Sequence, residues 1–90
     1  MAIDSALGPV IAQAVADLGD RLGVPADQVV VVSAEPVTWP DSGLGCRRPG
    51  MRYLQVPVDG ARIVLEHGDG RFDYHTGGRA RVPFLCEHPG

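Results

Sequence analysis

Alternating apolar and polar residues in the second half of the chain constrain its fold more than any other feature. The alternation runs through residues 52–58, 61–67 and 71–76, and it resumes over 82–86. A period of two residues is typical of strands with one buried face. Glycine-containing turn signals separate these segments, namely Asp59-Gly60, Gly68-Asp69-Gly70 and Gly77-Gly78. We therefore predict a β-meander over about residues 52–86.

The same alternation divides the predicted strands into two faces. The inner face would carry the apolar side chains Leu54, Val56, Val58, Ile63, Leu65, Phe72, Tyr74, Val82, Phe84 and Cys86. The other face would be wetter and carry Tyr53, Arg62, Glu66, Asp73 and His75. The sheet then needs one cover, on its inner face.

That cover is a helix predicted over about residues 9–22. Apolar residues recur there at spacings of three and four: Ile11, Val15, Leu18 and Leu22. Such a stripe packs against a core, and Pro9 and Gly23 suit the first turn and the end of a helix.

A first strand follows the helix, because valine occupies residues 29–32 without interruption. Pro36 either bends this strand or places it at the edge of the sheet. The fold class is then α+β, with one N-terminal helix packed on a four- to five-stranded, mostly antiparallel sheet. Ninety residues hold one such core, so residues 1–90 form a single domain.

Composition excludes several classes of protein. Hydrophobic residues make up 44% of the chain and charged residues 21%, as in globular rather than disordered proteins. No apolar run approaches the roughly 20 residues of a membrane span, and a formal charge of −3 disfavours nucleic acid as a partner. The N-terminus lacks a signal-peptide pattern, so we expect a cytoplasmic protein if Met1 is the native start.

Two cysteines, Cys46 and Cys86, leave the compartment open. Cys46 lies in the longest predicted loop, residues 40–51, which is rich in proline and glycine. A Cys46–Cys86 bridge would close a loop of about 40 residues and stabilise the domain by roughly 4 kcal/mol. Two buried free thiols are the alternative in a reducing cytosol, whereas an oxidised pair favours an extracytoplasmic location.

Two groups of motifs resemble a family of small, uncharacterised bacterial domains. The first group is Val37-Thr38-Trp39-Pro40-Asp41-Ser42-Gly43-Leu44-Gly45-Cys46 with Pro49-Gly50-Met51. The second group is Ala61-Arg62-Ile63-Val64-Leu65-Glu66 with Tyr74-His75-Thr76 and Leu85-Cys86. The resemblance covers about residues 35–86 and implies no particular catalytic activity. It also implies frequent export, which supports the Cys46–Cys86 bridge.

The order of elements is also similar to that of the potato inhibitor I family of serine-protease inhibitors. Both have a helix, a strand, a long exposed loop and a further strand, here Ala61-Arg62-Ile63-Val64-Leu65. This resemblance implies that the loop over about residues 40–50 enters a protease. Leu44 or Arg47 would then fill a specificity pocket.

Two kinds of chemical site would use these cysteines and histidines, and neither is expected. A thiol hydrolase would use Cys46 as nucleophile with His75, oriented by Asp73 or Asp41. A zinc site would use Cys46, Cys86, His75 and His88, but the usual ligand spacing is absent. We accordingly expect no enzyme, no metal and no cofactor.

We predict a non-catalytic interaction domain that binds another protein through its loop over residues 39–52. The residues expected to bind are Trp39, Asp41, Leu44, Arg47, Arg48 and Arg52. The arginines would favour an acidic partner surface. The oligomeric state stays open.

Overall fold

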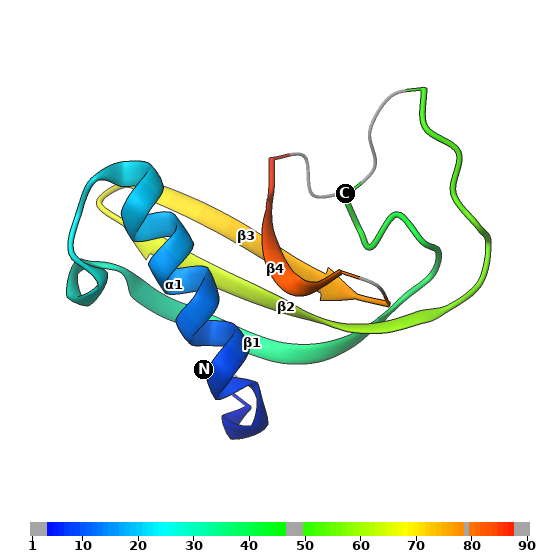
Figure 1. Cartoon of the computed structure of the whole chain (residues 1–90), viewed down its shortest axis with the longest axis horizontal. Coiled ribbons are helices and arrows are strands. Elements are labelled where there is room, and N and C mark those ends of the chain that lie inside the picture. Colours follow the sequence, from blue (N-terminus) through cyan, green and yellow to red (C-terminus); the bar gives the residue numbers. More distant parts are fainter. Residues whose placement is uncertain (1–3, 47–49, 79, 88–90) are drawn as a thin grey trace.

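The computed structural model describes residues 4–46, 50–78 and 80–87. One α-helix precedes a four-stranded antiparallel sheet, which confirms the predicted α+β fold (Figure 1). The elements are α1 (Gly8–Leu22), β1 (Val30–Trp39), β2 (Val58–His67), β3 (Gly70–Gly77) and β4 (Ala80–Cys86), with short 3-10 turns at Ser5–Leu7 and Ala26–Gln28. In these described parts of the chain, no helix is long and apolar enough to cross a membrane.

Helix α1 begins and ends where its terminal residues predict. Pro9 lies in the first turn, where its missing N–H costs nothing. Gly23 adopts a left-handed conformation with φ of 69° just after the last turn, a conformation that glycine accepts without a Cβ clash. The predicted helix over about 9–22 is therefore confirmed to within one residue.

The strands are arranged in chain order, β1-β2-β3-β4, and every neighbouring pair is antiparallel. β1 is thus an edge strand, which is where a sheet tolerates a proline such as Pro36, because the strand has a paired neighbour on one side only. The turn at Gly68 and Asp69 joins β2 to β3, as predicted.

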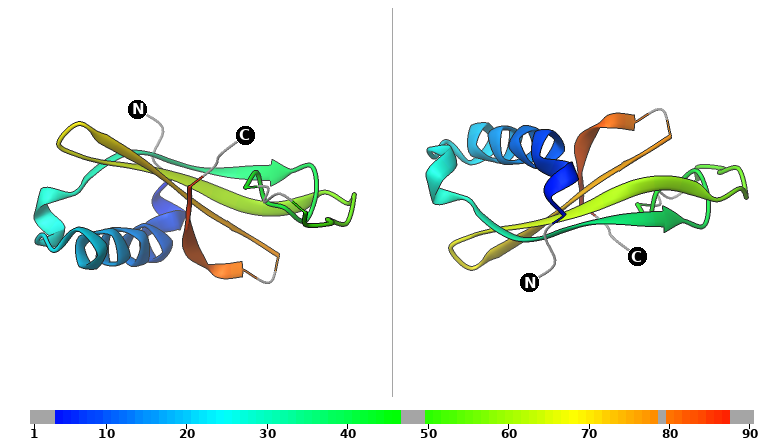
Figure 2. Two further views of the ribbon diagram at one scale, coloured as in Figure 1. Left: turned by 90° about the horizontal axis from the view of Figure 1, so that it is seen from above. Right: turned by 90° about the horizontal axis from the view of Figure 1, so that it is seen from below.

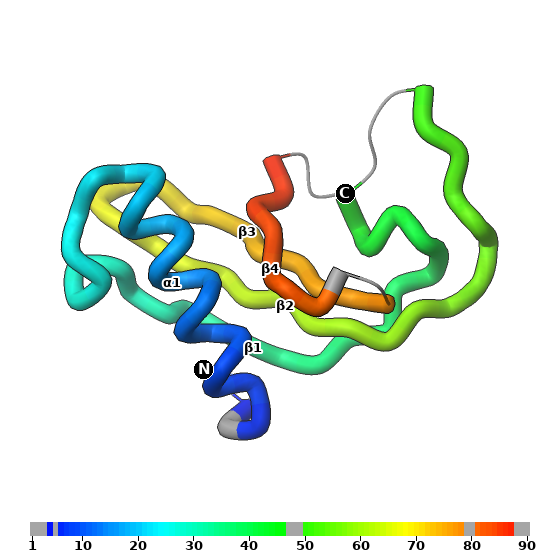
Figure 3. Tube along the Cα trace, in the orientation of Figure 1, coloured from blue at the N-terminus to red at the C-terminus, as the bar shows by residue number. Residues whose placement is uncertain are grey.

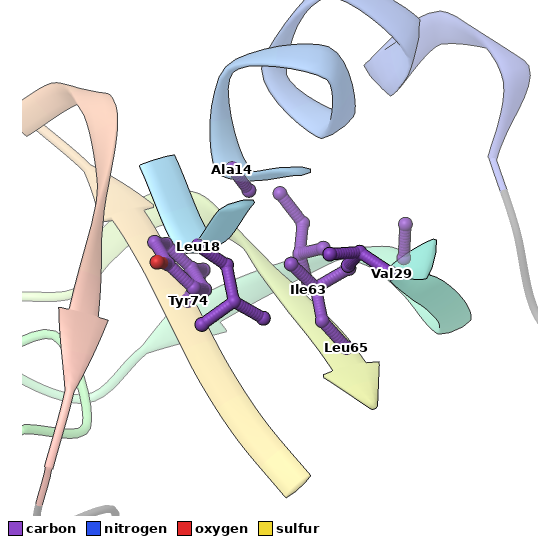
Figure 4. Packing of buried hydrophobic residues seen from close by; sticks show 7 residues of the cluster. Ala14, Leu18, Val29, Ile63, Leu65 and Tyr74 are labelled. Carbon is purple, nitrogen blue, oxygen red and sulfur yellow. The ribbon is translucent and has the colours of Figure 1, made fainter. Parts of the chain in front are cut away.

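The main core lies between α1 and one face of the sheet. Its buried residues are Ala14, Leu18, Val29, Ala34, Ile63, Leu65 and Tyr74 (Figure 4). Figure 2 shows α1 lying along one side of the sheet. Tyr74 donates a hydrogen bond of 2.6 Å from its hydroxyl to Asp17 of the helix. This bond lowers the pKa of Asp17, and burial together with the same bond raises the pKa of Tyr74.

Two predictions about the sheet are wrong. Residues 52–58 do not form a strand, because β2 starts only at Val58. Asp59 and Gly60 are not a hairpin turn but lie inside β2, where they pair with Thr38 and Val37 of β1. The hairpin between β1 and β2 therefore closes through the whole of residues 40–57, a much longer connection than the predicted loop.

The inner face of β4 was also assigned wrongly. Val82 is 65% exposed. The register places Leu85 beside Tyr74 on the helix side, whereas Phe84 pairs with His75 and Cys86 with Asp73. Phe84 and Cys86 thus lie on the face turned away from α1, and that face needs a cover of its own.

Candidate functional site

Residues 40–46, which we call the covering loop, follow β1 and cover the sheet face opposite the helix. His75, predicted on a wet face, is only 2% exposed there. Its ring stacks on Trp39 with a centroid separation of 4.6 Å, and it meets the ring of Phe84 in a T-shaped arrangement with a centroid separation of 6.2 Å. The wet-face prediction is wrong for His75 because residues 40–46 fold back over this end of the sheet.

Trp39 anchors that loop to the sheet. Its indole Nε1 donates a hydrogen bond of 2.7 Å to the carbonyl oxygen of Thr76. Glycines surround the ring: a Cβ on Gly45 would lie 2.5 Å from it, and one on Gly77 would lie 3.1 Å from it. Trp39 is therefore buried and holds the loop in place. Its predicted contact with a partner stays a prediction.

Leu44 fixes the orientation of the His75 ring. It is buried and adopts a φ of 56°, an unfavourable conformation for a residue with a Cβ. Its carbonyl oxygen lies 2.7 Å from Nδ1 of His75. Because a carbonyl only accepts hydrogen bonds, Nδ1 carries a proton in this arrangement.

The other ring nitrogen of His75 has no hydrogen-bond partner among the described residues. Its Nε2 lies 3.6 Å from Oδ1 of Asp73. That oxygen already accepts a hydrogen bond of 2.5 Å from Nε of Arg62, and this bond raises the pKa of Arg62. The carboxylate that would orient the histidine of a hydrolase is thus engaged by an arginine.

Asp41 shapes the turn of the loop. The side chain is buried, and its Oδ1 accepts a hydrogen bond of 2.8 Å from the backbone N–H of Gly43. The N–H of Leu44 donates to the backbone carbonyl of Asp41 at 3.3 Å. Asp41 therefore stabilises the loop from within, and its predicted contact with a partner stays a prediction.

Cys46 and Cys86 form a disulfide with a Cα–Cα distance of 5.7 Å. The alternative of two free thiols is wrong for this structure. The bridge joins the end of the covering loop to the end of β4, and it leaves Cys46 without the thiolate that the hydrolase hypothesis needs. Across residues 4–46, 50–78 and 80–87, no three histidine, cysteine or acidic side chains gather as a metal site.

Residues 50–57, which we call the arm, continue the connection away from the body of the protein. Figures 1 and 3 show the arm as an outlying arch beside the covering loop. Its large apolar side chains are exposed: Met51 by 59%, Leu54 by 72% and Val56 by 52%. Arg52 is exposed on the same segment, so the arm presents both apolar and basic groups to the solvent.

Ser42 ties the arm to the covering loop. Its backbone N–H donates to the carbonyl of Leu54 at 3.0 Å, and its hydroxyl accepts from the N–H of Leu54 at 2.8 Å. Tyr53 packs toward the loop, where its ring lies 3.4 Å from the position of a Cβ on Gly43. The centre of the arm is thus fixed although it belongs to no strand.

A separate cavity of about 310 Å³ lies beside the ends of β3 and β4. Its lining consists of Arg71, Phe72, Asp73, Leu85, Cys86 and Glu87. Arg71 bonds to Glu66 at 2.7 Å, and Asp73 bonds to Arg62. Of the charged residues in this lining, Arg71 and Asp73 thus already have intramolecular partners.

Of the predicted binding residues, the structure leaves only Arg52 exposed in the described part of the chain. Trp39, Asp41 and Leu44 form the buried support instead. Arg47 and Arg48 lie outside the described residues. The exposure of Met51, Leu54 and Val56 was missed, because alternation alone does not tell an unpaired arm from a strand.

A family model described as Domain of unknown function (DUF8738) matches residues 11–86. The match spans most of the chain, so the chain belongs to this family. No significant match was found among curated proteins or among solved structures. The resemblance to a small uncharacterised domain family is thereby confirmed, whereas the motif groups and the bacterial origin stay predictions.

Proposed function

We propose that this member of a family of unknown function is a small non-catalytic interaction domain that binds another protein through the arm. One observation carries the proposal: Met51, Leu54 and Val56 are all more than half exposed on one short segment. Clustered exposed apolar side chains typically mark a protein-binding surface. The tie to Ser42 and the nearby disulfide hold the arm in place before binding, which lowers the entropy lost on association.

The absence of catalysis is part of this proposal. The nucleophile and the base of the hydrolase hypothesis are poorly suited to chemistry, since His75 is 2% exposed and the sulfur of Cys46 is bonded to Cys86. The disulfide also favours an oxidising, extracytoplasmic setting.

Photo-crosslinking tests the binding surface directly. A photoreactive phenylalanine analogue would replace Leu54 in one variant and Val82 in a control variant, and each would be added to the proteins of the source cell. Val82 is a matched control because it is a similarly exposed apolar residue, 65% against 72%, on β4 instead of the arm. We expect discrete crosslinked products at position 54 and none at position 82. Equal labelling at both positions would contradict the proposal.

The serine-proteinase inhibitor alternative keeps one supporting observation, an exposed arm without regular secondary structure beside a disulfide. Its specificity residue is not Leu44, which is buried. Arg47, the other predicted specificity residue, lies outside the described residues, and Met51 and Arg52 are further exposed candidates. Assays against trypsin-like and chymotrypsin-like proteases decide the matter, since an absence of inhibition at micromolar protein would remove this alternative and leave the interaction domain standing.

A further inference from the structure

We propose that the arm binds its partner by strand addition, with the backbone of Gln55 pairing to the exposed edge of a β-sheet in another protein. This inference rests on the proposed function and adds the chemistry of the partner. Strand addition obtains affinity from backbone hydrogen bonds and specificity from alternate side chains.

Hydrogen bonding at Leu54 defines two edges of the arm. Ser42 engages the carbonyl of Leu54 through its backbone N–H and the N–H of Leu54 through its side-chain hydroxyl, so both backbone groups of Leu54 point toward the covering loop. In an extended chain the backbone groups of the next residue point to the opposite edge. In an extended arm the N–H and carbonyl of Gln55 thus face away from the loop, and within the described residues neither makes a hydrogen bond.

The centre of the arm has one half-buried side chain between two exposed ones. In an extended chain Arg52 and Leu54 share one face, and both are exposed, Leu54 by 72%. Tyr53 lies on the other face, against Gly43 of the covering loop. A bend at Val56 ends this stretch. Residues 52–55 thus present one outward face and one outward edge, the two features that a pairing strand needs.

The charge of the arm defines the partner further. Arg52 is the only charged residue among residues 50–57. Oppositely charged side chains on neighbouring strands stabilise their pairing. The partner edge should therefore carry an Asp or Glu beside Arg52 and apolar residues beside Leu54.

A second copy of this chain fits the arm less well than a different protein with a preformed sheet does. Two arms paired with each other would make only a two-stranded ribbon, which is marginal in water. A preformed sheet edge in another protein meets this requirement, because the arm then adds one strand to strands that are already paired.

The probe for this proposal is a phage-displayed library of disulfide-closed β-hairpins with a randomised outer strand. Hairpins would be selected on the full-length chain, and their affinities would then be measured on two variants at one position. Gln55→Pro removes the outward N–H, whereas Gln55→Ala keeps it and removes the same side chain. We expect selected hairpins with an acidic residue beside Arg52, binding to Gln55→Ala within about threefold of the parent chain and to Gln55→Pro about tenfold more weakly or worse.

Three results would overturn strand addition. The first is a library that yields no binders. The second is binding that survives Gln55→Pro but is lost in Leu54→Ser, which would leave the arm as an interaction surface without backbone pairing. The third is a concentration-dependent dimer in sedimentation, abolished by Gln55→Pro, which would identify a second copy as the occupant. If Gln55→Pro lowers the melting temperature, amide exchange at Gln55 in the parent chain replaces it: slower exchange with hairpin supports pairing, and unchanged exchange overturns it.

Discussion

Removal of the Cys46–Cys86 bridge should destabilise the domain mainly through its unfolded state. The two cysteines are separated by 40 residues. The chain-entropy relation for a loop of this length gives about −13 cal/mol/K, or about 4 kcal/mol at 25 °C. A domain of ninety residues has a free energy of unfolding of roughly 5–13 kcal/mol in total. The double variant Cys46→Ala/Cys86→Ala should therefore lose a large share of its stability.

Urea unfolding followed by tryptophan fluorescence measures this loss. Trp39 is the sole tryptophan and is buried beneath the covering loop, so its emission reports on the site as well as on the fold. With a urea slope of about 1–1.5 kcal/mol/M, the midpoint should fall by about 3 M. The reduced parent chain serves as a control and should match the double variant. A loss below about 1 kcal/mol in both would refute the view that this crosslink is a major source of stability.

Two further predictions concern packing and pH. Gly60→Ala should lower the melting temperature sharply, because its Cβ would overlap the carbonyl oxygen of Thr76, whereas the control Gly8→Ala has nothing within 4 Å and should be tolerated. Tyr74→Phe should reduce the loss of unfolding free energy at acid pH. The hydrogen bond from Tyr74 lowers the pKa of Asp17 in the folded state, so Asp17 stabilises the fold above its unfolded pKa of about 3.9. That stabilisation is lost as the pH falls through the folded pKa. The free energy of unfolding of both chains would be measured between about pH 6 and pH 2.5. A parallel loss of stability in the parent chain and Tyr74→Phe would contradict this prediction.

The fold was largely predictable because its signals are local. The stripe of α1 and the residues at its ends, Pro9 and Gly23, act within the helix itself. Ile63 and Leu65 are buried in the core on the helix side of β2, as the alternation predicts, although Val64 between them is buried as well. Each of these signals has one physical reading, and the structure agrees with it.

The site was less predictable because it depends on contacts between distant residues. The segment around Leu54 has the alternation of a strand, but the backbone of Leu54 bonds to Ser42 instead of to a neighbouring strand. Asp59-Gly60 has the sequence of a tight turn, yet the long connection lets both residues continue β2. His75 looks solvent-facing in sequence and is buried only because Trp39 and Leu44 fold over it. Alternation identifies a strand-like segment and says nothing about which chain will pair with it.

The most direct test of the account is the affinity of the arm for the protein captured by crosslinking at position 54. Loss of one buried leucine contact is worth about 1.5–3 kcal/mol, so Leu54→Ser should bind about 10- to 100-fold more weakly in titration calorimetry. Val82→Ser removes an equally exposed apolar side chain from β4 and should bind like the parent chain. Equal affinities for the parent chain and Leu54→Ser would contradict the claim that the arm is the binding surface.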